Sequence, residues 1–551
     1  MQACSKVLKH KMVYNIELPI NVKEVKKPNP KDKKKRTICS GKFAEFCNRT
    51  DLHGYKYIVM KDLTTLERSS WAVAVLVSVI IGIYFVITAY KWYARNPIVT
   101  VIESTQGAIW DVPFPAITIC DLNLISRKAA RAFADNLTLP ANVTADFVFE
   151  TVRLAPLIHS TYIVLMNQKR DLYTLQAVLD LNNISLEKLF RRVRQMFTIN
   201  ILPFYYFVIL TSLASITIFQ LSPVSSCSEL VERCMWKNTV YRCDQLFQQV
   251  FTQQSLCCTF NYYAIDVKEE GLPRRVASCG YQTALTVLVN TKPEDYYSAF
   301  VASQGSLVFI DDSYNVPDMD SPVRLVNPST EVMIALSPER TYSTPGIRAF
   351  SPDKRQCYFY DEKQIGSFKQ YSFHNCVTFQ KMEIVRAACD CVPFYYAVKD
   401  YYRTCNFNDI DCLERTDEYQ NFGNFVGSFV CLPECEHFNY HFEVALGTLA
   451  QNIKLNGHPF FNDVTLENRS LLNVFFNDLV STKYRRDVYL NWQNILASFG
   501  GLLSLMLGFT LISGFDLILF FTFRVNNVRT LCVCHVLLIM NHEYHDSFLY
   551  Y

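Results

Sequence analysis

The sequence predicts an α+β membrane protein in which two transmembrane helices flank one large, β-rich domain that is stapled by disulfides. Three observations support this fold class. Two long apolar runs lie towards the two ends of the chain, 15 of the 20 cysteines fall between them, and several segments of that interval alternate apolar and polar residues. With 551 residues and 50% hydrophobic content, the chain is too apolar to be mostly disordered.

The first apolar run covers residues 71–90, and we place a transmembrane helix at 71–93. About 20 helical residues cross the hydrocarbon core of a bilayer, so this run is long enough to span it once. The second run covers 495–523 and contains glycines, hydroxyl residues and an aspartate, which suit close packing and contact with water. We place the second helix at 491–523.

A third apolar run, at 199–221, passes the same length test, but we expect that it does not span. Four N-glycosylation sequons lie on both sides of it, at Asn136, Asn142, Asn183 and Asn468. A span here would place Asn468 and most cysteines in the reducing cytosol. We therefore expect residues 94–490 outside the cell and both termini, 1–70 and 524–551, in the cytoplasm of a plasma-membrane protein. No secretory leader is apparent in the first 60 residues.

The cysteines between the two runs predict an oxidised extracellular domain. They are Cys120, Cys227, Cys234, Cys243, Cys257, Cys258, Cys279, Cys357, Cys376, Cys389, Cys391, Cys405, Cys412, Cys431 and Cys435. Zinc is the alternative for the two close cysteine pairs at 389–391 and 431–435. Scattered histidines and an oxidising compartment disfavour it, so we expect no metal and no cofactor.

Composition and motifs exclude two further classes of function. The net charge of +3 is a near balance of 54 basic and 51 acidic residues, which gives no field suited to nucleic acid. A lysine-rich stretch at 23–36 predicts a solvated tail, with contact to anionic lipid as the alternative. The chain lacks a Gly-x-Ser-x-Gly elbow, a Walker loop and a His-Glu-x-x-His motif, so we do not expect an enzyme.

Alternation of apolar and polar residues predicts strands at 284–288, 307–310 and 332–336. The segments 367–379 and 381–388 are mixed or helical in their pattern. A β-rich domain with helical additions follows from these segments.

Five short motifs then occur in a fixed order. They are FPAITIC at 114–120, CCTFNY at 257–262, CDCVPFYY at 389–396, CLPEC at 431–435 and KYRRD at 483–487. Together with the two spans and LHG at 52–54, they resemble the epithelial sodium channel/degenerin superfamily, and within it the pickpocket branch, over residues 45–525.

The resemblance implies a palm, thumb and finger ectodomain and a trimeric channel. The implied function is a voltage-independent, amiloride-sensitive channel for sodium ions in the lipid bilayer, opened by an unidentified extracellular stimulus. Its partners are related channel subunits, in a homotrimer or a heterotrimer. The alternative is a non-conducting or auxiliary receptor subunit of a heteromeric channel.

The resemblance also implies six disulfides. The pairs are Cys120 with Cys257, Cys234 with Cys243, Cys357 with Cys435, Cys376 with Cys431, Cys389 with Cys412, and Cys391 with Cys405. Cys227, Cys258 and Cys279 remain, and their odd number predicts a free or intermolecular thiol without identifying it.

In the second span, Gly508, Phe509 and Thr510 align with the family's Gly-x-Ser selectivity tripeptide. Glycine lets backbones approach and exposes carbonyl oxygens, and a hydroxyl adds a further oxygen for a cation that sheds water. Thr510 keeps the hydroxyl and adds a methyl group, which leaves open the choice of sodium over potassium. Ser504 and Asp516 are the predicted pore-lining residues. Small residues that merely pack helices are the alternative.

Three residues are predicted to act in gating. His53 and Gly54 resemble the family's cytoplasmic His-Gly motif, with an ordinary turn as the alternative. Ala497 falls where bulk holds the gate open in degenerins, with a small packing residue as the alternative.

Residues 196–219 resemble an insertion. Related sequences continue from a segment like RRVRQ almost directly into one like LSPVSSCSEL. We interpret 196–219 as translated intron or as an isoform-specific segment.

Overall fold

The computed structural model describes residues 38–95, 97–161, 164–194, 227–265, 271–318, 321–396, 402–421, 431–450, 459–489, 492–520 and 522. The predicted insertion at 196–219 and the lysine-rich stretch at 23–36 lie outside these residues. The chain divides into two compact units, which we call the helical unit (Met1–Arg95 with Leu490–Tyr551) and the disulfide-rich unit (Asn96–Tyr489).

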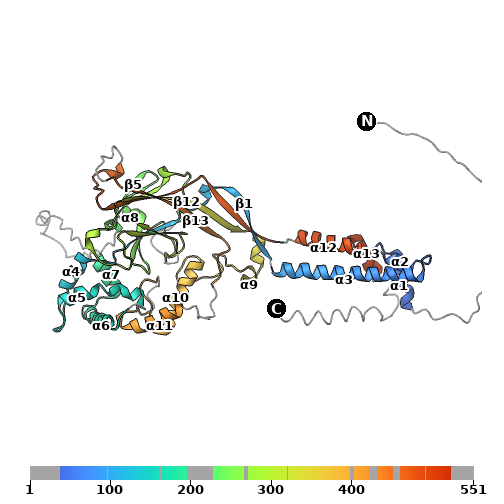
Figure 1. Cartoon of the computed structure of the whole chain (residues 1–551), viewed down its shortest axis with the longest axis horizontal. Coiled ribbons are helices and arrows are strands. Elements are labelled where there is room, and N and C mark those ends of the chain that lie inside the picture. The colour runs from blue at the N-terminus through green and yellow to red at the C-terminus, as the bar shows by residue number, and fades with distance from the viewer. Residues whose placement is uncertain are drawn as a thin grey trace, which may run out of the picture. The chain divides into compact units, whose positions relative to one another are not determined.

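The described helices of the helical unit are α1 (Ile38–Arg49), α2 (Tyr55–Val59), α3 (Thr65–Arg95), α12 (Trp492–Leu507) and α13 (Leu511–Leu519) (Figure 1). Helix α3 begins before the predicted span because Thr64 and Glu67 form a reciprocal cap. The Thr64 hydroxyl accepts the Glu67 N–H at 3.3 Å, and the Glu67 carboxylate accepts the Thr64 N–H at 2.8 Å.

Helix α3 is, among the described residues, the single helix long and apolar enough to cross a membrane by itself. The segments Gln493–Leu507 and Leu511–Leu519 pass the same test together, as one candidate span bent by 72°. Helix α12 packs along α3, where Met506 lies against Gly82. The second candidate span therefore packs against the first through α12.

The disulfide-rich unit contains strands and short helices in alternating groups. Its described strands are β1 (Ile98–Ala108), β2 (Ala116–Asp121), β3 (Ile125–Ser126), β4 (Val231–Trp236), β5 (Thr239–Tyr241), β6 (Phe247–Phe251), β7 (Leu256–Phe260), β8 (Leu285–Asn290), β9 (Tyr296–Ser298), β10 (Ser306–Asp311), β11 (Val323–Val326), β12 (Thr330–Ser343), β13 (His437–Thr448), β14 (Arg469–Phe476) and β15 (Val480–Val488). Its described α-helices are α4 (Arg127–Asp135), α5 (Ala145–Val152), α6 (Met166–Leu181), α7 (Leu186–Arg194), α8 (Cys243–Leu246), α9 (Pro352–Arg355), α10 (Phe373–Cys389) and α11 (Ile410–Asn421).

Two sheets enclose the main core of this unit. One has the order β1-β15-β12-β14-β8-β4-β5, with β13 added beside β12, and the other has the order β11-β10-β2-β7-β6. The Phe114 ring lies in the core at 4.9 Å from the Trp236 ring and 5.4 Å from the Phe476 ring. Strand β2 is buried on both faces, which explains why its sequence is apolar without strict alternation.

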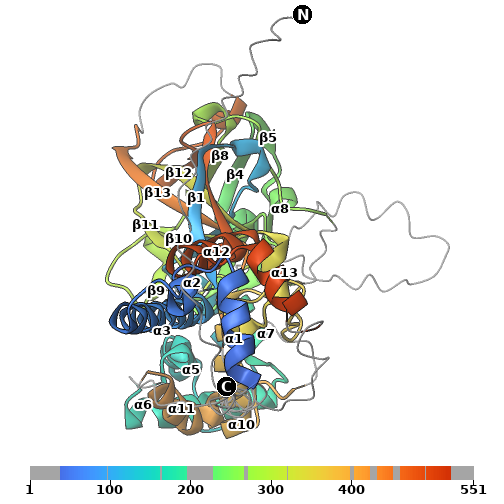
Figure 2. The same cartoon turned by 90° about the vertical axis from the view of Figure 1, so that its right-hand side faces the viewer.

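A second core belongs to the helices. Buried side chains of α4, α5, α6 and α7 pack together with residues of α10 and α11. In both views, α5, α6, α10 and α11 gather on one side of the strands (Figures 1 and 2). A buried Lys169 ties α6 to α11, because its ammonium group lies 2.8 Å from Asp411 and 2.6 Å from Glu414.

The expected local elements are found with revised bounds. The three predicted strands lie in β8, β10 and β12. The predicted helical segments at 367–379 and 381–388 join into the single helix α10, which begins at Phe373 because the Ser372 hydroxyl caps it.

Seven disulfides cross-link this unit. They include all six pairs that the resemblance implies. The seventh joins Cys227 to Cys258, and Cys279 is the free cysteine among the unit's described residues. Cys391 and Cys405 also lie close to Asp409, but their sulfurs are bonded to each other and cannot act as thiolate ligands of a metal.

A test follows from the seventh disulfide. Replacing Cys258 with serine should lower the stability of the purified full-length protein by about 2–4 kcal/mol, because the cross-link no longer restricts the unfolded chain. The measurement is the thermal melting temperature. Cys279→Ser is the matched control and should cost less than about 1 kcal/mol. Equal losses in the two variants would contradict the pairing.

Candidate functional site

Residues 508–510 interrupt the second candidate span. Gly508 has a φ of 66°, and its N–H donates to the Ser504 carbonyl at 2.8 Å, so α12 ends in a left-handed glycine turn. Thr510 is extended, and its hydroxyl accepts the Ser513 N–H at 3.2 Å. Gly508 thus ends α12 and Thr510 caps the start of α13. These two residues explain locally why the second candidate span is bent.

The His-Gly segment contacts this interruption. The backbone N–H of His53 donates to the carbonyl of Leu507 at 3.0 Å, which is one of the carbonyls left without a partner where α12 ends. A Cβ atom added to Gly508 would lie 2.6 Å from Cδ2 of the His53 ring. Glycine is therefore required at position 508, because the backbone has a positive φ there and because the His53 ring approaches closely.

Gly54 fits against the first span. It has a φ of 81°, and an added Cβ atom would lie 2.7 Å from Cγ2 of Val75 and 3.6 Å from the Trp71 ring. The Tyr57 ring stacks on Trp71 at 4.7 Å between centroids. The two residues of the motif thus contact different helices, His53 the break of the second and Gly54 the side of the first.

Aromatic rings support the other side of the break. Cζ of Phe509 lies 3.1 Å from the position of an added Gly514 Cβ atom, so the ring rests on the first turn of α13. Further along, the Phe46 ring of α1 lies 5.4 Å from the Phe520 ring. Helix α1 is thereby held near the end of α13.

The remaining predicted residues of this region lie on open faces of the single chain. Ala497 and Ser504 are exposed on α12, and Asp516 is exposed on α13. Nothing within the described chain covers these faces. Their orientation towards a pore stays a prediction.

The predicted glycosylation residues lie elsewhere. Asn136, Asn142, Asn183 and Asn468 are all exposed and all belong to the disulfide-rich unit. This placement leaves each side chain open to attachment of a sugar.

Sequence reasoning did not identify Leu507, Ser513 or Trp71 as part of this site. Ser513 had a local signal, because a threonine three residues before it marks a helix N-terminus. Leu507 contributes only its carbonyl oxygen. Trp71 contributes only its ring surface, against which Gly54 and Tyr57 pack. Neither role depends on a residue type that a motif would reveal.

Comparisons with known proteins identify the family of the chain. The family model described as amiloride-sensitive sodium channel matches residues 46–520. Sodium channel protein Nach of Drosophila ananassae is 24% identical, with 87% of this chain and 86% of that protein covered. Pickpocket protein 28 of Drosophila melanogaster is 22% identical, with 91% and 82% covered. Acid-sensing ion channel 1A of Danio rerio is 20% identical, with 86% of each chain covered.

The family match includes α3, the whole disulfide-rich unit and the break at 508–510. Proteins of this family are ion channels of membranes and not enzymes. The chain therefore belongs to the amiloride-sensitive sodium channel family, as a pickpocket-like member of the epithelial sodium channel/degenerin superfamily.

Proposed function

We propose that this chain is a subunit of a trimeric, voltage-independent, amiloride-sensitive sodium channel of the plasma membrane. In this proposal both candidate spans cross the bilayer, both termini are cytoplasmic, and an extracellular stimulus on the disulfide-rich unit opens the pore. The observation that carries the proposal is the break in the second helix at Gly508. There the His53 N–H donates a hydrogen bond to the Leu507 carbonyl.

Irregular backbone at membrane depth is stable where it lines water or is buried in protein. Three copies of the 508–510 segment around a common axis would present carbonyl oxygens at a narrow point. A cation that enters exchanges part of its hydration shell for these oxygens. Gly508 permits this approach because it has no side chain.

Asp516 supports a path for cations. An aspartate at the centre of a spanning helix costs about 2.5–3.5 kcal/mol on insertion scales, so it is expected to face water or a partner. It is exposed in the single chain. Three such carboxylates, together with Ser504 on the same proposed pore lining, would attract cations.

Two details favour an auxiliary role as the alternative. The Thr510 hydroxyl already accepts the Ser513 N–H and lies 3.0 Å from the Ser513 hydroxyl. Phe509 places a large ring in the middle of the tripeptide. The Thr510 hydroxyl is thus less available to a cation, and the Phe509 ring offers a cation no oxygen, so a subunit that conducts only beside related subunits is a second candidate.

Recordings from oocytes separate the two candidates. We expect an amiloride-blocked inward current that is carried by bath sodium, falls when potassium replaces it, and does not depend on voltage. Current from this chain alone supports the conducting subunit. Current that appears or changes only with a co-expressed pickpocket relative supports the auxiliary one. A chain that reaches the surface and does neither would contradict the proposal.

Gly508→Ala should abolish most of the current while leaving surface delivery intact. A non-glycine residue at this φ costs about 1–2 kcal/mol, roughly a five- to thirty-fold shift, and the new methyl group also meets the His53 ring. Gly501→Ala is the matched control, since no atom of the described residues lies within 4 Å of its added Cβ atom. Normal current in Gly508→Ala would refute the role of the break.

Ala497→Val should raise the constitutive sodium current, because bulk at this position of α12 is expected to hinder closure. Ala497→Ser, which changes size little, should leave the resting current low. Resting sodium current measured before and after amiloride gives the comparison. An unchanged current in a surface-expressed Ala497→Val channel would count against the alignment of α12.

A further inference from the structure

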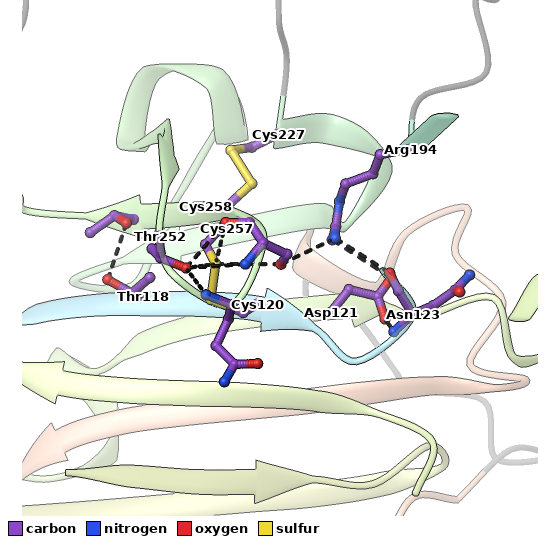
Figure 3. Close-up of a disulfide and its surroundings, with 12 residues drawn as sticks. Thr118, Cys120, Asp121, Asn123, Arg194, Cys227, Thr252, Cys257 and Cys258 are labelled. Atoms are coloured by element: carbon purple, nitrogen blue, oxygen red, sulfur yellow. Dashed lines mark hydrogen bonds and ion pairs between the residues drawn. A yellow bond between two sulfur atoms is a disulfide. The ribbon is translucent and has the colours of Figure 1, made fainter. Parts of the chain in front are cut away.

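A polar cavity of about 380 Å³ lies in the disulfide-rich unit, where the ends of β2, α7 and β8 meet. Six of its lining residues are Asp121, Arg194, Glu229, Cys258, Thr291 and Lys292. Figure 3 shows the Arg194 side chain directed towards Asp121, beside the Cys227–Cys258 disulfide. Its volume falls in the range of roughly 300–1,000 Å³ that is usual for small-molecule sites.

Arg194 is partly buried in this wall and has only long contacts with its partners among the described residues. Its side chain is 13% exposed, and its nitrogens lie 3.7 Å from the Asp121 carboxylate, 3.4 Å from the Asn123 carbonyl and 3.4 Å from the Ser255 hydroxyl. Close charge-assisted bonds measure about 2.7–2.9 Å. Among the described residues, the guanidinium fork therefore has no close acceptor, and partial burial strengthens the bond to one that binds there.

Thr291 adds an unused donor to the same cavity. Its hydroxyl is buried and has no hydrogen-bond partner among the described residues. Lys292 lies next to it, with its ammonium nitrogen 3.5 Å from Glu229. Arg194, Lys292 and the Thr291 hydroxyl thus line one cavity. Its other charged lining residues are Lys128, Arg469, Asp121, Glu229, Glu294, Asp295 and Glu467.

We propose that this cavity binds a small molecule through a carboxylate group, which accepts hydrogen bonds from Arg194 and Thr291. A carboxylate matches the planar fork of arginine with two parallel bonds. Lys292 adds charge attraction at longer range. The site is separate from the proposed pore and does not depend on ion conduction.

Asp121 competes with such a ligand for Arg194. Burial raises the pKa of Asp121 to about 6, against the opposing effects of Arg194, the Asn123 N–H, Tyr296 and Lys292. At pH 7.4 the carboxylate is mostly ionised, holds Arg194 and repels a second carboxylate. Below pH 6 it is mostly neutral and releases Arg194, so ligand affinity should rise as the pH falls.

Purified full-length protein in lipid nanodiscs can be titrated with lactate and with glutamate by calorimetry, with lactamide as the neutral control. The carboxylate groups of lactate and of glutamate remain ionised at pH 5.5. We expect saturable binding there, about twenty-fold weaker at pH 7.4 because fewer molecules carry a neutral Asp121, and none with lactamide. Absence of saturable carboxylate binding at pH 5.5 would overturn the proposal.

Two variants act in opposite directions. Asp121→Asn should bind at pH 7.4 as tightly as the unaltered protein at pH 5.5 and lose the pH dependence, whereas Arg194→Gln should lose binding. Arg170→Gln, at an exposed arginine of α6 outside the cavity, is the matched control. Unchanged binding in Asp121→Asn would overturn the proposal even if Arg194→Gln does not fold. The readout is binding, so a chain without current still permits this test.

Discussion

The hydrogen bond from the His53 N–H to the Leu507 carbonyl is the constraint on which the helical unit depends. A helix that breaks inside a bilayer exposes N–H and C=O groups that lipid cannot satisfy. Here His53 takes one freed carbonyl and the Thr510 hydroxyl takes the freed Ser513 N–H. The segment before α3 thereby stabilises the interruption, and it links an N-terminal motif to the second candidate span.

The disulfide-rich unit is held together differently, by two sheets around Phe114 and by seven covalent links. Strands β1 and β15 pair from Ile98 opposite Val488, and the Tyr489 N–H donates to the Pro97 carbonyl at 2.9 Å. The two chain segments that continue into the candidate spans therefore leave this unit from one strand pair.

Sequence reasoning reached the mixed helix and sheet architecture, the first apolar helix and the three strands, because apolar length and alternation are local signals. Six of the disulfides followed from the family resemblance of the motifs. It could not assign Cys227, Cys258 and Cys279, since pairing depends on which sulfurs the fold brings within reach. It singled out Gly508 within the second apolar run, yet not the contact with His53, which joins residues more than 400 positions apart through a backbone group. The cavity beside Arg194 was likewise hidden, because it is shaped by the ends of elements remote in sequence.

The most direct test is hydrogen exchange at the His53 amide in the full-length protein in lipid nanodiscs. We predict exchange about tenfold slower than in an unstructured peptide, or slower still, because the amide donates to the Leu507 carbonyl. Exchange at the rate of the unstructured peptide would contradict it.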